Sequence, residues 1–471
     1  METIRFYKNG KLLYELHKIN NLYVLTDIKF GKSKSFNEIP PELENLLPEG
    51  VNKELFAIKH NISIHNKFKL LKYLDDTFGR ISTTNIEKKE IEFDLNINSY
   101  DEAIKFVEDF EIEDVLLESF EFSMTPREKK IHLSYLSGQQ PKATIIVNQN
   151  SIRFAKKDEY SNAILKYSNK DFYLINVVEN MFLNFARFEL GFEVMPTFLL
   201  IDRQLRKSEF LRDTTDLFIT KRFDDRNKDY FEINSLLGYT SEEKYEISVE
   251  EIFEKMQNFL DKKEIEKLAK VYYFNYLIGN GDAHAKNFSV IQENDKYKLA
   301  PLYDVVNTQI YGFNYPLGIP LYKNSKDENF KEEELISLLN DYIEKEKLLE
   351  IKNMLKNKIK DYINKTPFKL FENGEKIKNK LIDFFKNRNL IIDYQTDNRI
   401  EELNEIINTN SELFTDELKQ LNNLKLNPNE QELEKLTDII ANKLGIEIKS
   451  LNEVEIKELD NKPNQNKKPK P

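Results

Sequence analysis

The chain of 471 residues contains neither cysteine nor tryptophan, and it has only five histidines. The lack of cysteine excludes disulfides, cysteine-based metal centres and thiol nucleophiles, and it fits a reducing compartment. The histidines are too scattered for a zinc site. No run approaches the ~20 apolar residues that span a membrane, and the first residues lack the apolar core of a signal peptide. We therefore expect a soluble, cytoplasmic protein with no zinc centre and no membrane contact.

The chain has fewer basic than acidic residues: it contains 70 Lys and Arg and 81 Asp and Glu, and its formal net charge is −11. This balance disfavours non-specific binding to nucleic acid as the main activity. Apolar residues make up 40% of the chain, which is enough for two or three domains with cores of their own.

Alternating apolar and polar residues dominate the first part of the chain. Over 1–35 they form two runs around the turn pair Asn9-Gly10, a pattern that predicts a β-hairpin. A helical pattern follows at 36–85. Further strands are expected at 91–97, 114–124, 142–148, 162–168, 197–202 and 216–223.

Helical patterns dominate the second part. A helix over 175–191 should close on Gly191, and amphipathic runs follow at 400–410 and 432–445. This order predicts a bilobal enzyme, strand-rich first and helical later. We divide the chain into five parts. They are a β-rich N-terminal subdomain (1–115), a strand-rich lobe (116–224), a helical lobe (225–395), a helical C-terminal extension (396–460) and a disordered tail (461–471).

The stretch NYLIGNGDAHAKNFSVI holds an Asp and an Asn five positions apart, directly after an apolar helical pattern. Gly279 and Gly281 should end the helix and allow unusual backbone angles. Asp282 follows at once and Asn287 comes five positions later. A hairpin pattern is next, and the motif PLYD then places a second carboxylate at Asp304.

This order fits phosphoryl transfer, which needs a carboxylate to accept the proton of an attacking hydroxyl and oxygen ligands for Mg²⁺ on the phosphates. Asp282 suits the role of base, while Asn287 and Asp304 suit the role of metal ligands. The alternative is a capped helix followed by a surface hairpin, because the same spacing occurs elsewhere, for example between Asp171 and Asn176.

Two further loop residues have open roles. His284 can pack or hydrogen-bond within the loop, which we favour over direct catalysis. Lys286 can neutralise a phosphate or remain a solvated charge, and the sequence does not decide between the two.

A nucleotide site needs a phosphate cradle upstream of this loop. The stretch SYLSGQQPKATIIVN offers a turn whose backbone amides can face phosphate oxygens. Its single glycine distinguishes it from a Walker loop and from the usual kinase glycine loop, so a plain β-turn is the alternative. The candidate ATP-binding residues here are Ser137, Gly138, Gln139, Gln140 and Lys142.

A lysine within an apolar strand needs either a partner or an exposed edge. In kinases such a lysine pairs with ATP phosphates and with a helix glutamate. Lys166 is in this position and Glu179 is the candidate partner, with exposed positions as the alternative for both. The stretch FITKRFDD, which includes Lys221 and Phe223, has the pattern of a strand leading into an inter-lobe connector, whose backbone could bind adenine.

Together these pieces resemble the HipA family of bacterial serine/threonine kinases, the toxins of type II toxin–antitoxin systems. The matching motifs are YLSGQQPKA, AILKYS, VVENMFLNFARFELGFEVMP, ITKRFDD, NYLIGNGDAHAKNFSVI and YKLAPLYDVV, in family order over about 131–310. The resemblance implies an α+β, bilobal protein-kinase-like fold with β-rich N-terminal subdomains and a helical C-terminal lobe. It also implies ATP and Mg²⁺ as cofactors, with Asp282 as base, Asn287 and Asp304 as metal ligands and Lys166 on the ATP phosphates.

Regulation and partners follow from the resemblance alone. Family members can autophosphorylate a serine in the phosphate loop, and Ser137 is the best candidate here, although Tyr135 stands where some members carry another serine. Known family substrates include aminoacyl-tRNA synthetases. The usual partner is a small helix-turn-helix antitoxin, through which DNA is contacted indirectly. The segment after 395 exceeds the usual family length.

Two other functions compete with a toxin kinase. A small-molecule or lipid kinase is one, because antibiotic kinases use a similar Asp–Asn loop, although they usually have His-Gly where this chain has Asn280-Gly281. A catalytically inactive HipA-like binding module is the other, and the full set of candidate ligands disfavours it.

Overall fold

The computed structural model describes residues 1–105, 111–112, 140, 142–149, 151–167, 172–200, 217–294, 296–323, 329–391, 403, 407, 415–426 and 430–444. The chain divides into two compact units, Met1–Ile391 and Ile392–Pro471. None of the helices among the described residues is long and apolar enough to cross a membrane. The strand expected at 114–124 and the tail at 461–471 lie outside the described residues.

The chain begins with a five-stranded sheet in the order β4-β3-β2-β1-β5. The predicted hairpin is confirmed, since Asn9 and Gly10 have φ of 49° and 70° and turn the chain between the first two strands. The strands are β1 (Glu2–Lys8), β2 (Lys11–Ile19), β3 (Leu22–Asp27), β4 (Lys32–Phe36) and β5 (Ile81–Ser82).

Three short helices cover this sheet: α1 (Pro41–Glu44), α2 (Gly50–Lys59) and α3 (Lys67–Leu71). The helical pattern of 36–85 is thus only partly right, because the prolines and glycine of the stretch PPELENLLPEG interrupt it. One hydrophobic core extends from Ile4 to Leu74. We call residues 1–84, which carry this core and the sheet, the N-terminal region.

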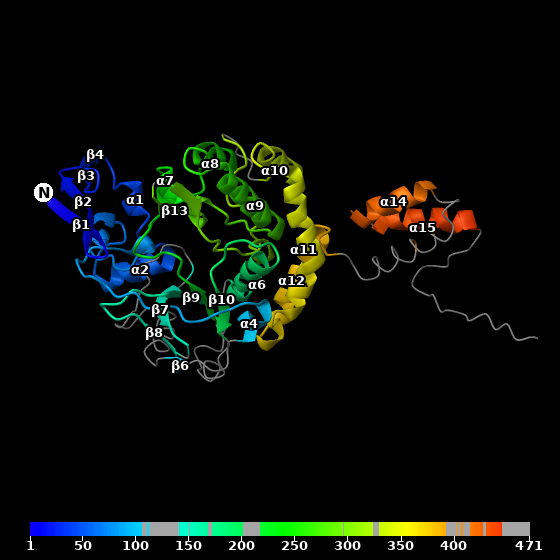
Figure 1. Ribbon diagram of the computed structural model, residues 1–471, viewed down its shortest axis with the longest axis horizontal. Helices are drawn as coiled ribbons and strands as arrows, with labels where there is room; N and C mark the ends of the chain where they lie inside the picture. The colour runs from blue at the N-terminus through cyan, green and yellow to red at the C-terminus, as the bar shows by residue number, and fades with distance from the viewer. Residues whose placement is uncertain are drawn as a thin grey trace, which may run out of the picture. The chain divides into compact units, whose positions relative to one another are not determined.

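A six-stranded sheet follows in the order β10-β11-β9-β7-β8-β6. Its helix α6 (Ile175–Phe188) matches the expected one and ends before Gly191, whose φ is 65°. Figure 1 shows α6 between this sheet and the helices α11 and α12. The elements are α4 (Tyr100–Lys105), β6 (Glu111–Ile112), β7 (Lys142–Val147), β8 (Ser151–Phe154), β9 (Ala163–Tyr167), β10 (Thr197–Leu200) and β11 (Leu217–Lys221).

The strand predicted at 91–97 is wrong. Phe93, Leu95 and Ile97 are buried and alternate with exposed residues as in a strand, but the segment joins no sheet. The carbonyl of Glu92 instead accepts a hydrogen bond from the side chain of Asn162 at 3.0 Å. The alternation therefore reported which side chains are buried, not how the backbone pairs.

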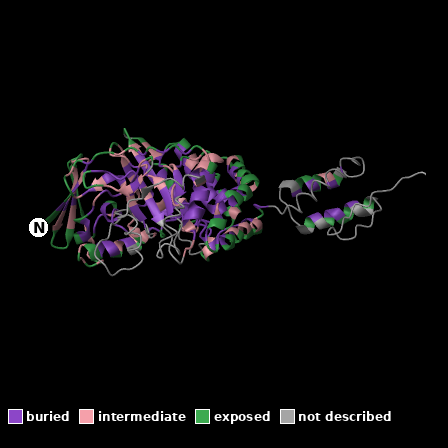
Figure 2. Cartoon of the chain, turned by 90° about the horizontal axis from the view of Figure 1, so that it is seen from below, coloured by how far each residue is buried: buried purple, intermediate pink, exposed green. Residues whose placement is uncertain are grey.

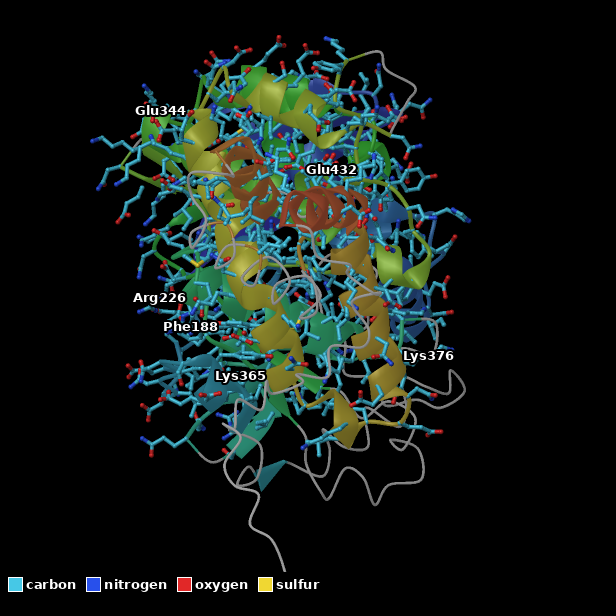
Figure 3. The ribbon with its side chains drawn as sticks, turned by 90° about the vertical axis from the view of Figure 1, so that its right-hand side faces the viewer. Phe188, Arg226, Glu344, Lys365, Lys376 and Glu432 are labelled. Carbon is cyan, nitrogen blue, oxygen red and sulfur yellow. The ribbon has the colours of Figure 1, made fainter. Side chains whose placement is uncertain are left out.

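The helical lobe surrounds a three-stranded sheet in the order β12-β13-β14. Figure 3 shows α11, its longest helix, between Glu344 and Lys365. The elements are β12 (Asp229–Glu232), α7 (Ile233–Leu236), α8 (Val249–Met256), α9 (Lys262–Ile278), β13 (Ser289–Glu293), β14 (Lys296–Leu299), α10 (Glu332–Leu339), α11 (Lys345–Lys365) and α12 (Gly374–Asn387).

A second hydrophobic core extends from Phe93 to Ile391 and joins the six-stranded sheet to the helical lobe. Phe185 on α6 stacks on Phe274 of α9 at 6.2 Å between ring centroids, which connects the two layers. Buried residues fill the interior of this unit, while the strands nearest the N-terminus carry mainly half-buried and exposed ones (Figure 2).

The second unit contains α14 (Thr415–Leu426) and α15 (Glu430–Leu444), and the latter confirms the helix expected at 432–445. Seven apolar residues form its own core: Leu403, Ile407, Leu421, Leu424, Leu433, Leu436 and Ile440. The five-part division of the chain stays a prediction.

Candidate active site

A cavity of about 770 Å³ lies between the six-stranded sheet and the loops after α9 and β14. Its volume is in the range typical of small-molecule and cofactor sites. Of the candidate residues, Ser137, Gly138 and Gln139 lie outside the described residues. The structure brings the other candidates together around this one cavity: Gln140, Lys142, Lys166, Glu179, Lys221, Phe223, Asp282, His284, Lys286, Asn287 and Asp304.

Lys166 connects the two lobes across the cavity. It lies in β9 and is only 5% exposed. Its Nζ donates to Glu179 of α6 at 2.7 and 3.0 Å, and it also donates to Asp304 Oδ1. The lysine–glutamate pair expected from the sequence is therefore present, and a residue 138 positions further along the chain completes it.

The charges around Lys166 are arranged in two opposing pairs. Lys142 stands directly opposite Lys166 in the antiparallel register of β7 and β9, and burial lowers the pKa of Lys142. Burial also favours the neutral form of Glu179, and for a carboxyl group this raises the pKa. For Asp304 burial acts in the same direction, but Lys166 and Lys142 outweigh it and lower the pKa of Asp304 to about 2. The sheet thus presents two amino groups, and an ionised Asp304 faces them.

The loop after α9 is fixed by hydrogen bonds on both sides. Gly279 ends the helix in the left-handed conformation with φ of 74°, as expected. The amide of Gly281 donates to Thr308 Oγ1 at 2.8 Å, and Asn280 Nδ2 donates to the carbonyl of Asp304 at 3.1 Å. The loop and the Asp304 segment are therefore held as one assembly.

Asp282 extends from this loop with its side chain 48% exposed. Tyr245 donates its hydroxyl hydrogen bond to Asp282 Oδ1 at 2.8 Å. His284 lies behind it, with Nε2 at 3.6 Å from the same oxygen and its ring edge-on to Tyr245. Burial lowers the pKa of His284 to about 4, which fits the packing role preferred for it.

The oxygen donors suit a magnesium ion bound together with phosphates. Asn287 Nδ2 donates to the carbonyl of Asp282 at 2.7 Å, which fixes the amide beside the cavity. Asp304 has a second carboxylate oxygen besides the one that accepts from Lys166. Although the described residues contain no group of three or more His, Cys, Asp and Glu around a metal position, Mg²⁺ needs only one or two carboxylates when phosphates and water complete its shell.

Lys286 is buried, so the hypothesis that it is a solvated charge is wrong. The side chain is 4% exposed, and its Nζ lies 2.6 Å from Glu49 Oε1 and 2.9 Å from Ser241 Oγ. Glu49 belongs to the N-terminal region. Its carboxylate neutralises Lys286 within the protein.

Two backbone amides of the connector already donate hydrogen bonds within the protein, so fewer backbone groups are left for a base than the sequence indicates. The amides of Lys221 and Arg222 donate to the carbonyls of Pro196 and Asn162 at 3.0 and 2.9 Å. The Phe223 ring stacks on Tyr303 with centroids 5.6 Å apart and lines the cavity. An adenine would therefore meet the Phe223 side of the connector rather than these two amides.

About half of the chain matches a known protein family. Residues 134–365 match the family described as HipA-like C-terminal domain. The chain contains a HipA-like C-terminal domain. The resemblance to the HipA family is thereby confirmed, and the matched segment carries every candidate residue of the cavity named from the sequence.

Two curated proteins are similar to parts of the chain. "Putative kinase Y4mE" of Sinorhizobium fredii is 47% identical over 45 residues, which are 10% of this chain and 11% of that protein. "Putative kinase" of Haemophilus influenzae is 28% identical over 193 residues, which are 37% of this chain and 53% of that protein. The chain thus spans at most about half the length of these relatives.

A solved structure shows the same fold. The match is a chain of the Shewanella oneidensis MR-1 complex of HipA, HipB and operator DNA, with a TM-score of 0.59 and 19% identity over 82% of this chain and 97% of that chain. The HipA-like protein therefore has the α+β, bilobal kinase-like fold predicted from its sequence.

Sequence patterns missed several residues that line the cavity, among them Glu49, Phe78 and Tyr245. Glu49 and Phe78 precede the HipA-like segment, and Tyr245 lies in a polar stretch without a recognisable motif. Their neighbours in the fold are far away in sequence, so no local spacing identifies them.

Proposed function

We propose that this HipA-like protein is an ATP- and Mg²⁺-dependent serine/threonine protein kinase that acts in the cytoplasm as a growth-inhibiting toxin. The observation that carries the proposal is the convergence of Lys166, Glu179, Asp282, Asn287 and Asp304 on one cavity. These side chains come from distant parts of the chain and match the groups that phosphoryl transfer requires.

In this proposal the amino groups of Lys166 and Lys142 bind the phosphates of ATP, and Glu179 keeps Lys166 oriented. Asn287 and Asp304 would hold Mg²⁺, which when bound neutralises negative charge on the phosphates. Asp282 accepts the proton of the acceptor hydroxyl, and that oxygen attacks the terminal phosphoryl group of ATP while ADP leaves. The half-exposed Asp282 is within reach of an acceptor on another protein.

Partners belong to the same proposal. The similar chain from Shewanella assembles with HipB and operator DNA, which supports a small helix-turn-helix antitoxin here and DNA contact through it. We propose a translation component such as an aminoacyl-tRNA synthetase as substrate, and autophosphorylation at Ser137 as regulation.

The proposal is tested by comparing the wild type with Asp282→Asn. With labelled ATP and Mg²⁺, the wild type should label protein in a lysate, and the variant should do so about 10²–10⁴-fold more slowly because the base is lost. Asp158→Asn removes a carboxylate that is 54% exposed and far from Asp282 in the sequence, and this variant should behave like the wild type. Phosphoproteomics of cells expressing the same variants identifies the targets and reports on Ser137.

Other outcomes favour the alternatives. Labelling of small alcohols instead of protein indicates a small-molecule or lipid kinase. An absence of Mg²⁺-dependent ATP binding, measured calorimetrically, indicates an inactive binding module. If Asp282→Asn inhibits growth as strongly as the wild type, toxicity does not come from kinase activity.

A further inference from the structure

The N-terminal region contacts the loop that carries Asp282, although it lies outside the HipA-like segment. Asn45 donates to the carbonyl of Tyr239 at 2.8 Å, and Glu44 accepts from the amide of Ser241 at 2.9 Å. Asn52 of α2 donates to the carbonyl of Gln140 at 3.1 Å. The region therefore touches both the end of the phosphate turn and the segment that leads to Tyr245.

Glu49 makes the contact nearest to the site. One carboxylate oxygen lies 2.6 Å from Lys286 Nζ, and the other accepts from Lys244 Nζ at 2.8 Å. Both lysines are buried, at 4% and 5% exposure. Burial raises the pKa of Glu49, but the two lysines outweigh it and hold the pKa far below its usual range. Glu49 is therefore an ionised bridge between two buried cations.

A second carboxylate near Lys286 is a poorer counterion. Glu232 Oε2 is 3.5 Å from Lys286 Nζ, and burial raises the pKa of Glu232 to about 7. Glu49, whose oxygen lies 2.6 Å from Lys286 Nζ, is thus the nearer partner of Lys286.

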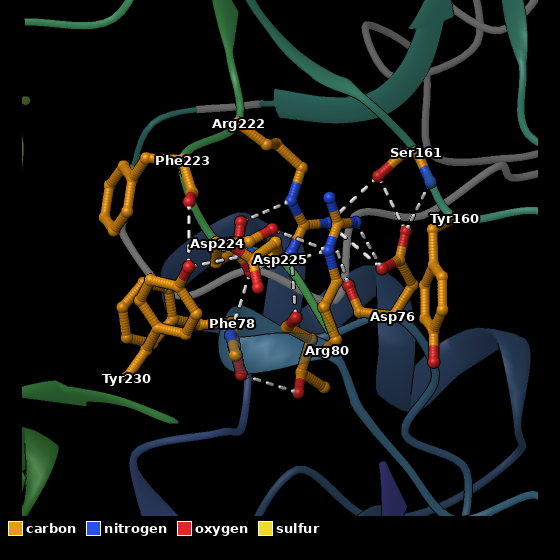
Figure 4. Close-up of polar contacts among 12 residues, drawn as sticks. Asp76, Phe78, Arg80, Tyr160, Ser161, Arg222, Phe223, Asp224, Asp225 and Tyr230 are labelled. Carbon is orange, nitrogen blue, oxygen red and sulfur yellow. Dashed lines mark hydrogen bonds and ion pairs between the residues drawn. The ribbon is translucent and has the colours of Figure 1, made fainter. Parts of the chain in front are cut away.

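The same region also holds the connector between the lobes, as Figure 4 shows. Arg80 donates to Asp76 and to the carbonyl of Asp224 at 2.9 and 2.8 Å, and Arg222 donates to Asp224 Oδ1 at 2.9 Å. Arg222 also donates to Ser161 Oγ at 2.9 Å. Two arginines and two aspartates form a neutral, buried cluster, an arrangement that is stable only when every charge keeps its partners.

Lys286 lies in sequence between the candidate base Asp282 and the candidate metal ligand Asn287. Its long side chain passes into the protein and ends on Glu49, so the position of Glu49 restrains the loop backbone. Loss of the Glu49 charge would leave two buried lysines without their nearest counterion, which favours movement of the loop toward water.

We propose that Glu49 is a positioning residue: through Lys286 and Lys244 it fixes the Asp282 loop, while Asp76 and Arg80 fix the connector, so that the N-terminal region sets the geometry of the site. The proposal rests on the kinase activity proposed above. It assigns to a segment outside the HipA-like domain a part in the alignment of the reacting groups, exerted through Lys286 and Lys244.

The test compares the wild type with Glu49→Gln, which keeps the shape and removes the charge, and with Glu49→Asp, which keeps the charge. Since a misplacement of about 1 Å can cost ~10²-fold in rate, Glu49→Gln should lower kcat about 10- to 100-fold while the KM for ATP changes little. Glu49→Asp should recover a large part of kcat. Glu15→Gln is the matched control, because it removes a carboxylate of the same region that pairs with the exposed Arg5 and with His17.

Hydrogen exchange of the amides at 282–288 gives a readout that needs no catalysis, and it should accelerate in Glu49→Gln alone. An unchanged kcat and unchanged exchange in Glu49→Gln overturn the proposal. The proposal is also overturned if kcat falls equally in Glu49→Gln and Glu49→Asp and if this fall is explained by the fraction of unfolded protein in each variant. If the wild type itself transfers no phosphate, the proposed function fails, while the exchange measurement still decides whether Glu49 holds the loop.

Discussion

Replacement of Lys166 by methionine removes the charge at the centre of the cavity and keeps the length of the side chain. Lys166 Nζ donates hydrogen bonds to Glu179 at 2.7 and 3.0 Å, and it also donates one to Asp304. Glu179 is 1% exposed, so water cannot replace the lost partner. Removing one member of a buried ion pair costs roughly 3–5 kcal/mol, and we expect the free energy of unfolding to fall by about this amount.

The assay is urea unfolding of the full chain without added Mg²⁺ or ATP. Addition of Glu179→Gln to Lys166→Met removes the carboxylate that lost its partner, so the double variant should be less destabilised than the sum of the two single variants by roughly 0.5–3 kcal/mol, the size of coupling measured between contacting residues. Lys89→Met is the control, because Lys89 is 75% exposed and pairs with the exposed Asp158 at 3.2 Å. A surface pair of this kind contributes little. If Lys166→Met unfolds at the same urea concentration as Lys89→Met, the charge of Lys166 does not stabilise the buried carboxylates of Glu179 and Asp304.

Two other predictions concern the loop. The pKa of His284 is lowered from 6.5 to about 4 by burial, so between these values the unfolded chain binds a proton that the folded chain does not. The free energy of unfolding should therefore fall on acidification, by about 2 kcal/mol at pH 5 from this residue, and His284→Asn should be less acid-sensitive in urea titrations than the wild type. In Gly281→Ala the new Cβ would lie 2.8 Å from Thr308 Oγ1 and 2.9 Å from the carbonyl oxygen of Tyr315. The loop must shift, and transfer should slow by about 10²-fold with ATP affinity retained; equal rates would show that the loop tolerates the displacement.

Local elements were predictable where one residue type has a specific backbone or packing role. The turn at Asn9-Gly10 and the helix end at Gly279 both have positive φ, which favours the residues present there. The prediction at 91–97 failed because alternation encodes burial, and Phe93 and Leu95 are buried without sheet pairing. Whether a backbone pairs with a neighbouring strand depends on segments elsewhere in the chain.

The candidate site was predictable to the extent that its residues conflict with their surroundings. A lysine in the apolar run AILKY cannot be buried alone, so the run implies either a partner or an exposed edge for Lys166, and the structure shows the partner. Glu49 stands in a polar, proline-containing segment where a glutamate conflicts with nothing. Its partners Lys244 and Lys286 are about 200 positions away and stand in equally polar stretches.

This difference separates two classes of functional residue in the HipA-like protein. Groups proposed to touch ATP or the acceptor are constrained by chemistry to a few residue types at fixed spacings, which makes a motif. Groups that only hold those residues in place need a charge of the right sign at the right point in space, and any segment of the fold can supply it. Because the N-terminal region meets both the connector, through Arg80, and the loop, through Glu49, the geometry of the motif depends on residues that the motif does not contain.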